Sequence, residues 1–249
     1  MEIKNKFWEK WKEVSDLEIK AFKTLNFGFK SIFEILPKNT IISIYVKGSF
    51  PLRQMNKDSD VDFVVVIKDN SYLEKIKEFD GKNRNICVPP LNISAYSIEE
   101  LKENKRVRGG KIRASPDLFV RYLDRYELIY GLNLKKDDYK MRDIEILFKS
   151  RLKAFRAVFI PMYLDKTKKK LGFGDLIKQV FYLVELDLEL DKKTVPRTWK
   201  ELDVLIKNKN HIIHDTYNLR VNYTKYKNKK ETYLGKLEKY LSTLDKKVN

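Results

Sequence analysis

The sequence predicts an α+β protein whose first part contains the strands and whose second part is helical. Three short runs of β-branched and apolar residues in the first 100 positions alternate with stretches of helical periodicity. From about residue 140 onward, apolar residues recur at helical spacing almost to the end of the chain. We therefore expect an α/β domain with a mixed sheet over residues 1–138 and a helical bundle over residues 139–249.

The first domain is expected to open with one or two helices and to continue with strands. Apolar side chains recur at helical spacing between residues 5 and 36, and Pro37 follows them. The period then changes, because the next apolar runs are short, continuous and rich in β-branched residues, as in strands covered on both faces. The strands are expected at 40–46, 61–67, 91–97 and 125–134.

Helices are expected between these strands and throughout the second domain. Two short helical stretches are expected near 70–79 and 116–124, and Ser115 followed by Pro116 is typical of a helix start. In the second domain, three apolar stripes indicate amphipathic helices that pack around a common core. These stripes begin at Ile144, Leu176 and Leu234.

The composition points to a polyanionic partner. The chain of 249 residues contains 52 Lys and Arg against 35 Asp and Glu, which gives a formal net charge of +17. Lys, Ile and Asn are abundant everywhere in the chain, so the compositional background of an AT-rich genome or a thermophile explains part of this excess equally well. The charge therefore indicates a class of partner and no reaction.

Cysteine and histidine usage excludes two common kinds of site. Cys87 is the single cysteine, so an internal disulfide is excluded, and with two histidines a Cys/His zinc site is excluded as well. No run approaches the roughly 18 consecutive apolar residues of a membrane span, and the mixed-charge N-terminus is unlike a signal peptide. We expect a cytoplasmic protein without a membrane partner.

A pair of aspartates stands at the start of the second strand. In SDVDF, at 59–63, Asp60 and Asp62 are two residues apart, so both side chains project from one face with their α-carbons about 6.5 Å apart. Two like charges at this spacing repel each other unless a divalent cation lies between them. Mg²⁺ suits such a pair, because it binds one or two carboxylates and completes its shell with water and substrate phosphates.

A phosphate site is predicted just upstream of these aspartates. Gly48 and Ser49 follow the first strand, and FPLRQM at 50–55 is expected to begin a helix. Glycine allows close approach of the backbone, and the serine hydroxyl and free N–H groups can face an anion. Arg53 and Lys57 follow in the loop and can contact the β- and γ-phosphates, although ordinary solvent exposure explains them equally well. Together these residues predict a site for a Mg²⁺-bound nucleoside triphosphate.

The order Gly48-Ser49, a spacer and then SDVDF resembles the G-S…S-D-x-D signature of the DNA polymerase β-like nucleotidyltransferase superfamily, with its kanamycin and minimal nucleotidyltransferase types. The resemblance is close over residues 45–67. It implies that Gly48 and Ser49 bind the triphosphate and that Asp60 and Asp62 hold two catalytic Mg²⁺ ions. The reaction it implies transfers a nucleotidyl group, AMP from ATP by the habit of the family, to an acceptor hydroxyl with release of pyrophosphate.

Two departures from the family pattern stand out. The family commonly has a third carboxylate on the following strand, where this chain has Asn92, which can ligate a metal through its carbonyl but cannot act as a base. Some relatives supply an acidic residue from the helical domain, and Glu185 or Asp187 are candidates, although the polar face of a core helix is the commoner explanation for both. The loop after Ser49 also lacks the small or glycine-rich sequence often found there.

RNA, including the end of a tRNA, is the acceptor that the charge favours. Basic segments at 102–113, 166–174 and 223–233, the last two with interleaved aromatic residues, suit contact with nucleic acid, and a solvated surface is their alternative explanation. Aminoglycosides are polycations and match a basic protein poorly, while a protein or another small molecule stays open as acceptor. The alternative function is that of a nucleotide- or RNA-binding protein with weakened catalysis. It is suggested by Asn92, which stands where the family commonly has a third carboxylate.

Overall fold

The computed structural model describes residues 2–3, 5–107, 114–165, 171–222 and 227–248. The chain divides into two compact units, Met1–Met141 and Arg142–Asn249. Parts of the three basic segments that we expected to contact nucleic acid, namely 108–113, 166–170 and 223–226, lie outside the described residues. In the part of the chain that the structure describes, none of the helices has the length and apolar character needed to cross a bilayer.

The first unit is built on a mixed four-stranded sheet, which confirms the predicted α+β class. The strand order is β3-β2-β1-β4; β2 and β3 are parallel, whereas β1 is antiparallel to both β2 and β4. A parallel pair needs a crossover connection, and α2 provides it. The strands are β1 (Ile41–Lys47), β2 (Val61–Ile67), β3 (Leu91–Ser97) and β4 (Glu127–Gly131).

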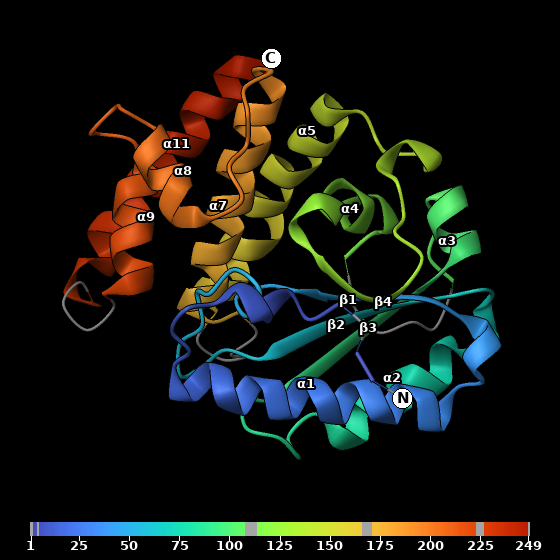
Figure 1. Ribbon diagram of the computed structural model, residues 1–249. Coiled ribbons are helices and arrows are strands. Elements are labelled where there is room, and N and C mark those ends of the chain that lie inside the picture. The colour runs from blue at the N-terminus through green and yellow to red at the C-terminus, as the bar shows by residue number, and fades with distance from the viewer. Residues whose placement is uncertain (1, 4, 108–113, 166–170, 223–226, 249) are drawn as a thin grey trace. The chain divides into compact units, whose positions relative to one another are not determined.

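One face of the sheet is covered by α1 (Asp16–Ile35) and α2 (Leu73–Asn83), which lie side by side below the strands in Figure 1. A capping box at Ser15 and Glu18 begins α1, because each side chain accepts from the backbone N–H of the other residue. The core of this face joins α1 to alternate strand residues. Its fully buried members include Leu25, Phe29, Ile32, Ile44, Val46, Phe63 and Val65.

The opposite face carries a smaller core under α3 (Ile98–Glu103) and α4 (Pro116–Arg121). Phe119 of α4 stacks on Tyr96 of β3, with ring centroids 5.0 Å apart. Val64 and Val66 of β2 belong to this core, so the strand is buried on both faces along most of its length. The continuous apolar run VDFVVVI is explained by this double burial.

Short one-turn elements complete the first unit. The expected helix near 70–79 is a 3₁₀ turn followed by α2, and the one expected near 116–124 is α4 followed by a 3₁₀ turn. The last strand is shorter than the predicted 125–134, because Gly131 has a φ of +85° and its α-carbon packs against the backbone of Ile42. The 3₁₀ turns are η1 (Phe7–Lys10), η2 (Lys38–Thr40), η3 (Asn70–Tyr72), η4 (Leu123–Arg125) and η5 (Lys136–Asp138).

The second unit is helical over its described residues. Two ion-pair groups join its last helix to earlier ones: Lys247 lies 2.5 Å from Asp187 and 2.6 Å from Asp191, and Arg156 contacts Glu238 and Asp245. The elements are α5 (Ile144–Ala154), the π-helical turn η6 (Phe155–Phe159), α6 (Ile160–Leu164), α7 (Phe173–Leu190), α8 (Trp199–Leu205), α9 (Ile212–Val221), the 3₁₀ turn η7 (Lys227–Lys229) and α11 (Lys230–Val248).

Candidate functional site

Asp60 directly precedes β2 and Asp62 is the second residue of this strand, and both project on the face that carries α3 and α4. The residues that alternate with them, Val61 and Phe63, are fully buried in the core under α1, so the aspartates project to the other side. The side chain of Asp60 is 35% exposed and that of Asp62 is 16% exposed. Both carboxylates are therefore held on a stiff strand and are still open to solvent.

Asp62 stands between two partners on the neighbouring strands. In the sheet register, Lys47 of β1 and Asn92 of β3 both lie opposite Asp62, and residues opposite each other share a face. The Lys47 Nζ is 3.6 Å from Asp62 Oδ1, and the Asn92 side-chain amide nitrogen donates a hydrogen bond to the same oxygen. The carboxylate of Asp62 is thus positioned from both sides.

Asp60 has its own cation, supplied by the segment after α2. The guanidinium of Arg84, which follows the last residue of α2, is 3.8 Å from Asp60 Oδ2. Backbone hydrogen bonds fix this segment beside the aspartates, because Leu91 donates its N–H to the Arg84 carbonyl and Val61 donates its N–H to the Pro90 carbonyl. The start of β2 and the end of α2 therefore form one local assembly.

Gly48 brings the turn after β1 against the aspartates. Its φ is +80°, a conformation that favours glycine, and a Cβ at this position would stand 2.7 Å from Asp62 Oδ2. The residue after it, Ser49, is half-buried. The structure thus places Gly48, which we predicted to bind phosphate, directly beside Asp62, which we predicted to bind metal.

Our prediction of a helix that begins in FPLRQM is wrong, because residues 48–53 form consecutive turns. Arg53 donates its N–H to the Phe50 carbonyl, Gln54 donates to the Ser49 carbonyl, and Arg53 has a φ of 55°. The physical reason is Phe50, which is fully buried against Trp11 and other rings under the sheet. This anchor holds the segment in a turn, so the site has no helix N-terminus at this point.

Ser59, to which we assigned no role, organises the loop before the aspartates. It is 6% exposed, and its hydroxyl accepts from the backbone N–H of Asn56 at 2.9 Å and donates to the Asn56 side chain at 3.3 Å. The same Asn56 oxygen accepts the N–H of Asp58. Asn and Ser favour turns because their side chains form hydrogen bonds with nearby backbone groups, and this composition is the signal that the sequence offers for the turn.

Arg53 is engaged with Glu18. Its Nε donates to Glu18 Oε1 at 2.9 Å, and the guanidinium lies 4.8 Å above the Trp11 ring. Burial tends to raise the pKa of Glu18, but hydrogen bonds from Arg53 and Ser15 outweigh it and hold the pKa below its ordinary value. Arg53 therefore joins the turn to the start of α1. Lys57 is exposed.

The candidates for a third carboxylate both lie on α7. Glu185 is 2% exposed within the helical unit. Asp187 contacts Lys247 and also accepts a hydrogen bond from the Tyr240 hydroxyl at 3.4 Å. These contacts give Asp187 a role in holding α11 against α7.

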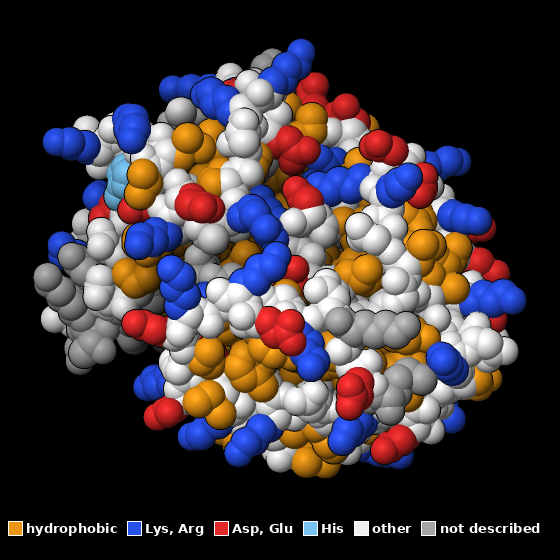
Figure 2. All heavy atoms as spheres, in the orientation of Figure 1, with side chains coloured by type: hydrophobic (Ala, Val, Ile, Leu, Met, Phe, Trp, Pro, Cys, Tyr) orange, Lys and Arg blue, Asp and Glu red, His pale blue; other side chains and the backbone are white. Residues whose placement is uncertain are grey.

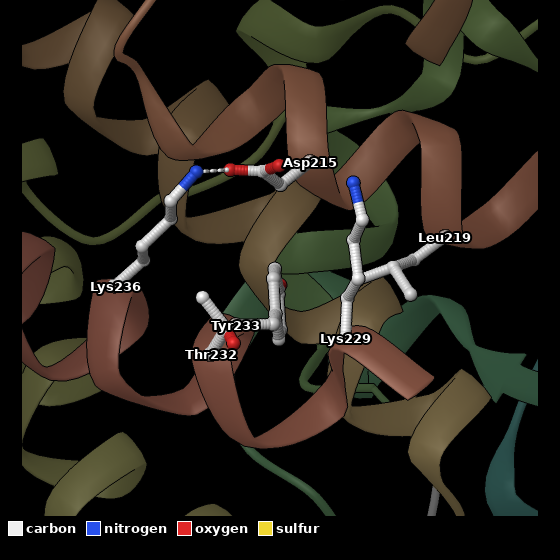
Figure 3. A pocket seen from close by; sticks show the side chains of 6 residues that line it. All are labelled: Asp215, Leu219, Lys229, Thr232, Tyr233 and Lys236. Carbon is white, nitrogen blue, oxygen red and sulfur yellow. Dashed lines mark hydrogen bonds and ion pairs between the residues drawn. The ribbon is translucent and has the colours of Figure 1, made fainter. Parts of the chain in front are cut away.

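The helical unit contains a pocket of about 180 Å³ between α9, η7 and α11, shown in Figure 3. Asp215 and Lys236, which both line it, form an ion pair of 2.5 Å. The hydroxyl of Tyr233 lies 3.0 Å from that of Thr216, and burial raises the pKa of this tyrosine. Its polar groups thus serve the packing of α11 on α9. The pocket is lined by Asp215, Leu219, Lys229, Thr232, Tyr233 and Lys236.

The donor set on β2 fits a divalent ion such as Mg²⁺. Among the described residues, no group of three or more His, Cys, Asp and Glu side chains gathers as a metal site. The donors at the start of β2 are two carboxylates on one face, and Mg²⁺ needs no more from a protein when water and phosphates complete its shell. Asn92 turns its amide nitrogen toward Asp62, which suits a positioning role better than metal ligation.

Comparison with known protein families gives a match within the first unit. The family model described as "Nucleotidyltransferase domain" matches residues 29–115, which include both aspartates and the Gly-Ser turn. Searching the curated proteins gave no match.

Several solved structures are similar to the chain, and two of them illustrate the likeness. One is spectinomycin adenyltransferase AAD(9) from Enterococcus faecialis with ATP and spectinomycin, at 15% identity over 82% of this chain and 90% of that one, with a TM-score of 0.46. The other is a toxin-antitoxin with AMP-PNP, at 15% identity over 59% of this chain and 98% of that one, with a TM-score of 0.28. On the strength of the family model, residues 29–115 form a nucleotidyltransferase domain of the DNA polymerase β-like superfamily, as the motif predicted.

Proposed function

We propose that this protein is a metal-dependent nucleotidyltransferase that moves a nucleoside monophosphate from a nucleoside triphosphate to an acceptor hydroxyl. The observation that carries the proposal is the contact between Gly48 and Asp62, which brings the Gly-Ser turn against the two carboxylates of β2. A triphosphate on this turn would have its phosphates next to Asp60 and Asp62. Because the family commonly uses ATP, we propose ATP as the donor and AMP as the transferred group.

Each residue of the site has a proposed role. Asp60 and Asp62 would hold two Mg²⁺ ions. When bound, these ions would neutralise the negative charge of the phosphate oxygens and of the attacking and leaving oxygens. Gly48 lets the backbone approach the triphosphate, and Ser49 offers its hydroxyl and N–H to it. Asn92 orients Asp62 through its hydrogen bond. Such chemistry depends mainly on positioning and charge neutralisation, which a rigid strand pair supplies.

RNA, including the end of a tRNA, is the acceptor that we propose. Support comes from the formal net charge of +17, since a basic protein attracts a phosphate backbone. Lys and Arg side chains are scattered over the face shown in Figure 2, with Asp and Glu between them. A hydroxyl of a protein or of a small molecule is the other acceptor class.

One observation favours a second candidate function. Asn92 takes the position where the family commonly has a third carboxylate, and it donates to Asp62 where a carboxylate would repel it. A site with this residue can bind Mg²⁺ and nucleotide yet has no base at this position. Nucleotide- or RNA-binding with weakened catalysis is therefore the alternative.

The test is transfer of label from each α-³²P nucleoside triphosphate to total RNA in the presence of Mg²⁺. We expect transfer by the wild type and loss of transfer by Asp60→Ala and Asp62→Ala. The matched control is Asp58→Ala, which removes an exposed loop aspartate two residues before the site and should retain activity. Mg²⁺-dependent nucleotide binding without transfer to RNA would favour the alternative function or another acceptor. Absence of both binding and transfer would overturn the proposal.

A third carboxylate from the helical unit can be tested separately. Glu185→Gln preserves size and removes the charge, so loss of transfer with an unchanged melting temperature would identify Glu185 as part of the machinery. A loss of activity in Asp187→Asn is harder to interpret, because this substitution also weakens the contact with Lys247. Full activity of both variants would assign these residues to the packing of α7.

A further inference from the structure

Each carboxylate of the candidate site has a basic partner from a neighbouring element. Lys47, at the end of β1, faces Asp62 at 3.6 Å, and Arg84, just after α2, faces Asp60 at 3.8 Å. Neither basic residue belongs to the motif that identifies the domain. Sheet register and the loop before β3 bring them to the site from positions far apart in the sequence.

These two ion pairs are loose in geometry. Both separations are longer than the roughly 3.2 Å at which an N–H···O hydrogen bond is usual, so charge attraction dominates. The side chains are also accessible, with Lys47 29% exposed and Arg84 42% exposed. Partly exposed pairs of this kind contribute little to stability. Their partners can therefore be exchanged at small cost.

We infer that Lys47 and Arg84 are exchangeable cations, which neutralise Asp62 and Asp60 when no metal is bound and transfer to the phosphate oxygens when metal and nucleotide enter. The inference rests on the proposed function. Lys47 precedes Gly48 directly, so its ammonium starts beside the turn that we propose for the triphosphate. Arg84 can bind phosphate oxygens in pairs through its planar guanidinium.

Charge balance supports this exchange. A nucleoside triphosphate with two Mg²⁺ ions is close to neutral as a unit, so its arrival leaves the total charge of the site almost unchanged. The carboxylates gain metal ions as partners, and the phosphates need new cations. Metal binding by the carboxylates releases Lys47 and Arg84 at a place where both can reach the phosphates. A purely structural ion pair would have no such second partner.

The inference predicts opposite effects on two binding constants. With Mn²⁺ as the probe, followed by electron paramagnetic resonance or calorimetry, Lys47→Met and Arg84→Met should bind the ion alone about two- to fivefold tighter, because a competing cation is gone. The same variants should bind Mn²⁺ with α,β-methylene ATP roughly tenfold weaker, because a charge-assisted phosphate contact is lost.

Two further variants make the test specific. Lys68→Met removes one exposed positive charge just beyond the other end of β2 and should change neither constant, which controls for net charge. Lys47→Arg keeps the charge and should retain affinity for the analogue, which separates loss of charge from loss of fold.

Three outcomes would contradict the inference. Constants that are unchanged, or that shift in the same direction in Lys47→Met and Arg84→Met, would overturn it and leave the proposed function intact. A wild-type protein that binds neither Mn²⁺ nor the analogue would overturn the proposed function itself.

Discussion

Gly48 lies so close to Asp62 that any side chain at position 48 would place its Cβ 2.7 Å from the carboxylate oxygen Oδ2. The φ of +80° adds strain for every residue other than glycine. We predict that Gly48→Ala lowers the free energy of unfolding by roughly 1–2 kcal/mol. It should also displace the Asp62 carboxylate and weaken Mn²⁺ binding. Urea denaturation and Mn²⁺ titration measure the two effects.

Gly81→Ala is the matched control for this substitution. Gly81 lies within α2, and an added Cβ there would meet nothing within 4 Å. Alanine is favoured over glycine in a helix, so this variant should be more stable by up to about 1 kcal/mol and should bind Mn²⁺ as the wild type does. Equal behaviour of the two alanine variants would refute the proposed packing of Gly48 on Asp62.

The hydrogen bond from Asn92 to Asp62 leads to a second prediction. Asn92→Asp replaces the donor by a negative charge next to Asp62, so the protein without metal should lose about 1 kcal/mol of unfolding free energy. Added Mn²⁺ should raise the melting temperature of this variant more than that of the wild type, because three carboxylates bind the ion better than two. A smaller metal-induced shift than in the wild type would show that position 92 does not face the ion.

Variants of Arg53 and Lys57 distinguish a structural role from a contact with the ligand. Arg53→Met leaves Glu18, which is 5% exposed, without the guanidinium, so we expect a loss of about 1–3 kcal/mol in unfolding free energy. At a temperature where the variant is folded, its affinity for the nucleotide analogue should be unchanged. Lys57→Met should give the converse pattern, with unchanged stability and weaker analogue binding. If folded Arg53→Met binds the analogue more weakly than the wild type does, the result would support the predicted contact between Arg53 and the phosphates.

His211 makes the stability of the helical unit depend on pH. Burial lowers its pKa and outweighs the opposing effect of Asp187, so the folded state favours neutral histidine. Its Nδ1 also accepts the N–H of Ile213 at the start of α9, which protonation would prevent. The stabilising effect is complete above the ordinary histidine pKa near 6.5 and should decline as the pH falls below it.

His211→Asn provides the comparison for this prediction. Asparagine caps a helix well and does not titrate, so the variant should keep the cap at every pH. Denaturation of both proteins between pH 7.5 and pH 5 should show a steeper loss of stability in the wild type. Parallel curves would exclude His211 as the source of the pH dependence.

The strands and the aspartate pair could be predicted because their causes are local. A strand buried on both faces must be apolar along its length, and VDFVVVI shows this directly. The period of two residues along a strand places Asp60 and Asp62 on one face whatever the remainder of the chain does. The third family position on the next strand likewise led to Asn92, which the structure pairs with Asp62.

The features that sequence patterns missed depend on residues far apart in the chain. The turn at 48–53 replaces a helix because Phe50 is held among rings that include Phe7 and Phe22. Arg53 binds Glu18, which lies 35 positions away. Lys47 and Arg84 reach the aspartates only through strand register and a loop connection. No local periodicity encodes these contacts.

The mixed sheet also determines the order in which the site can assemble during folding. The antiparallel partners β1 and β2 are joined by residues 48–60, whereas the parallel pairing of β2 with β3 requires the whole crossover through α2. Shorter loops close with less loss of entropy, so Asp62 should meet Lys47 before it meets Asn92. We therefore expect the complete site to form late in folding, when β3 joins the sheet. A bound metal ion should therefore slow unfolding and leave the folding rate almost unchanged.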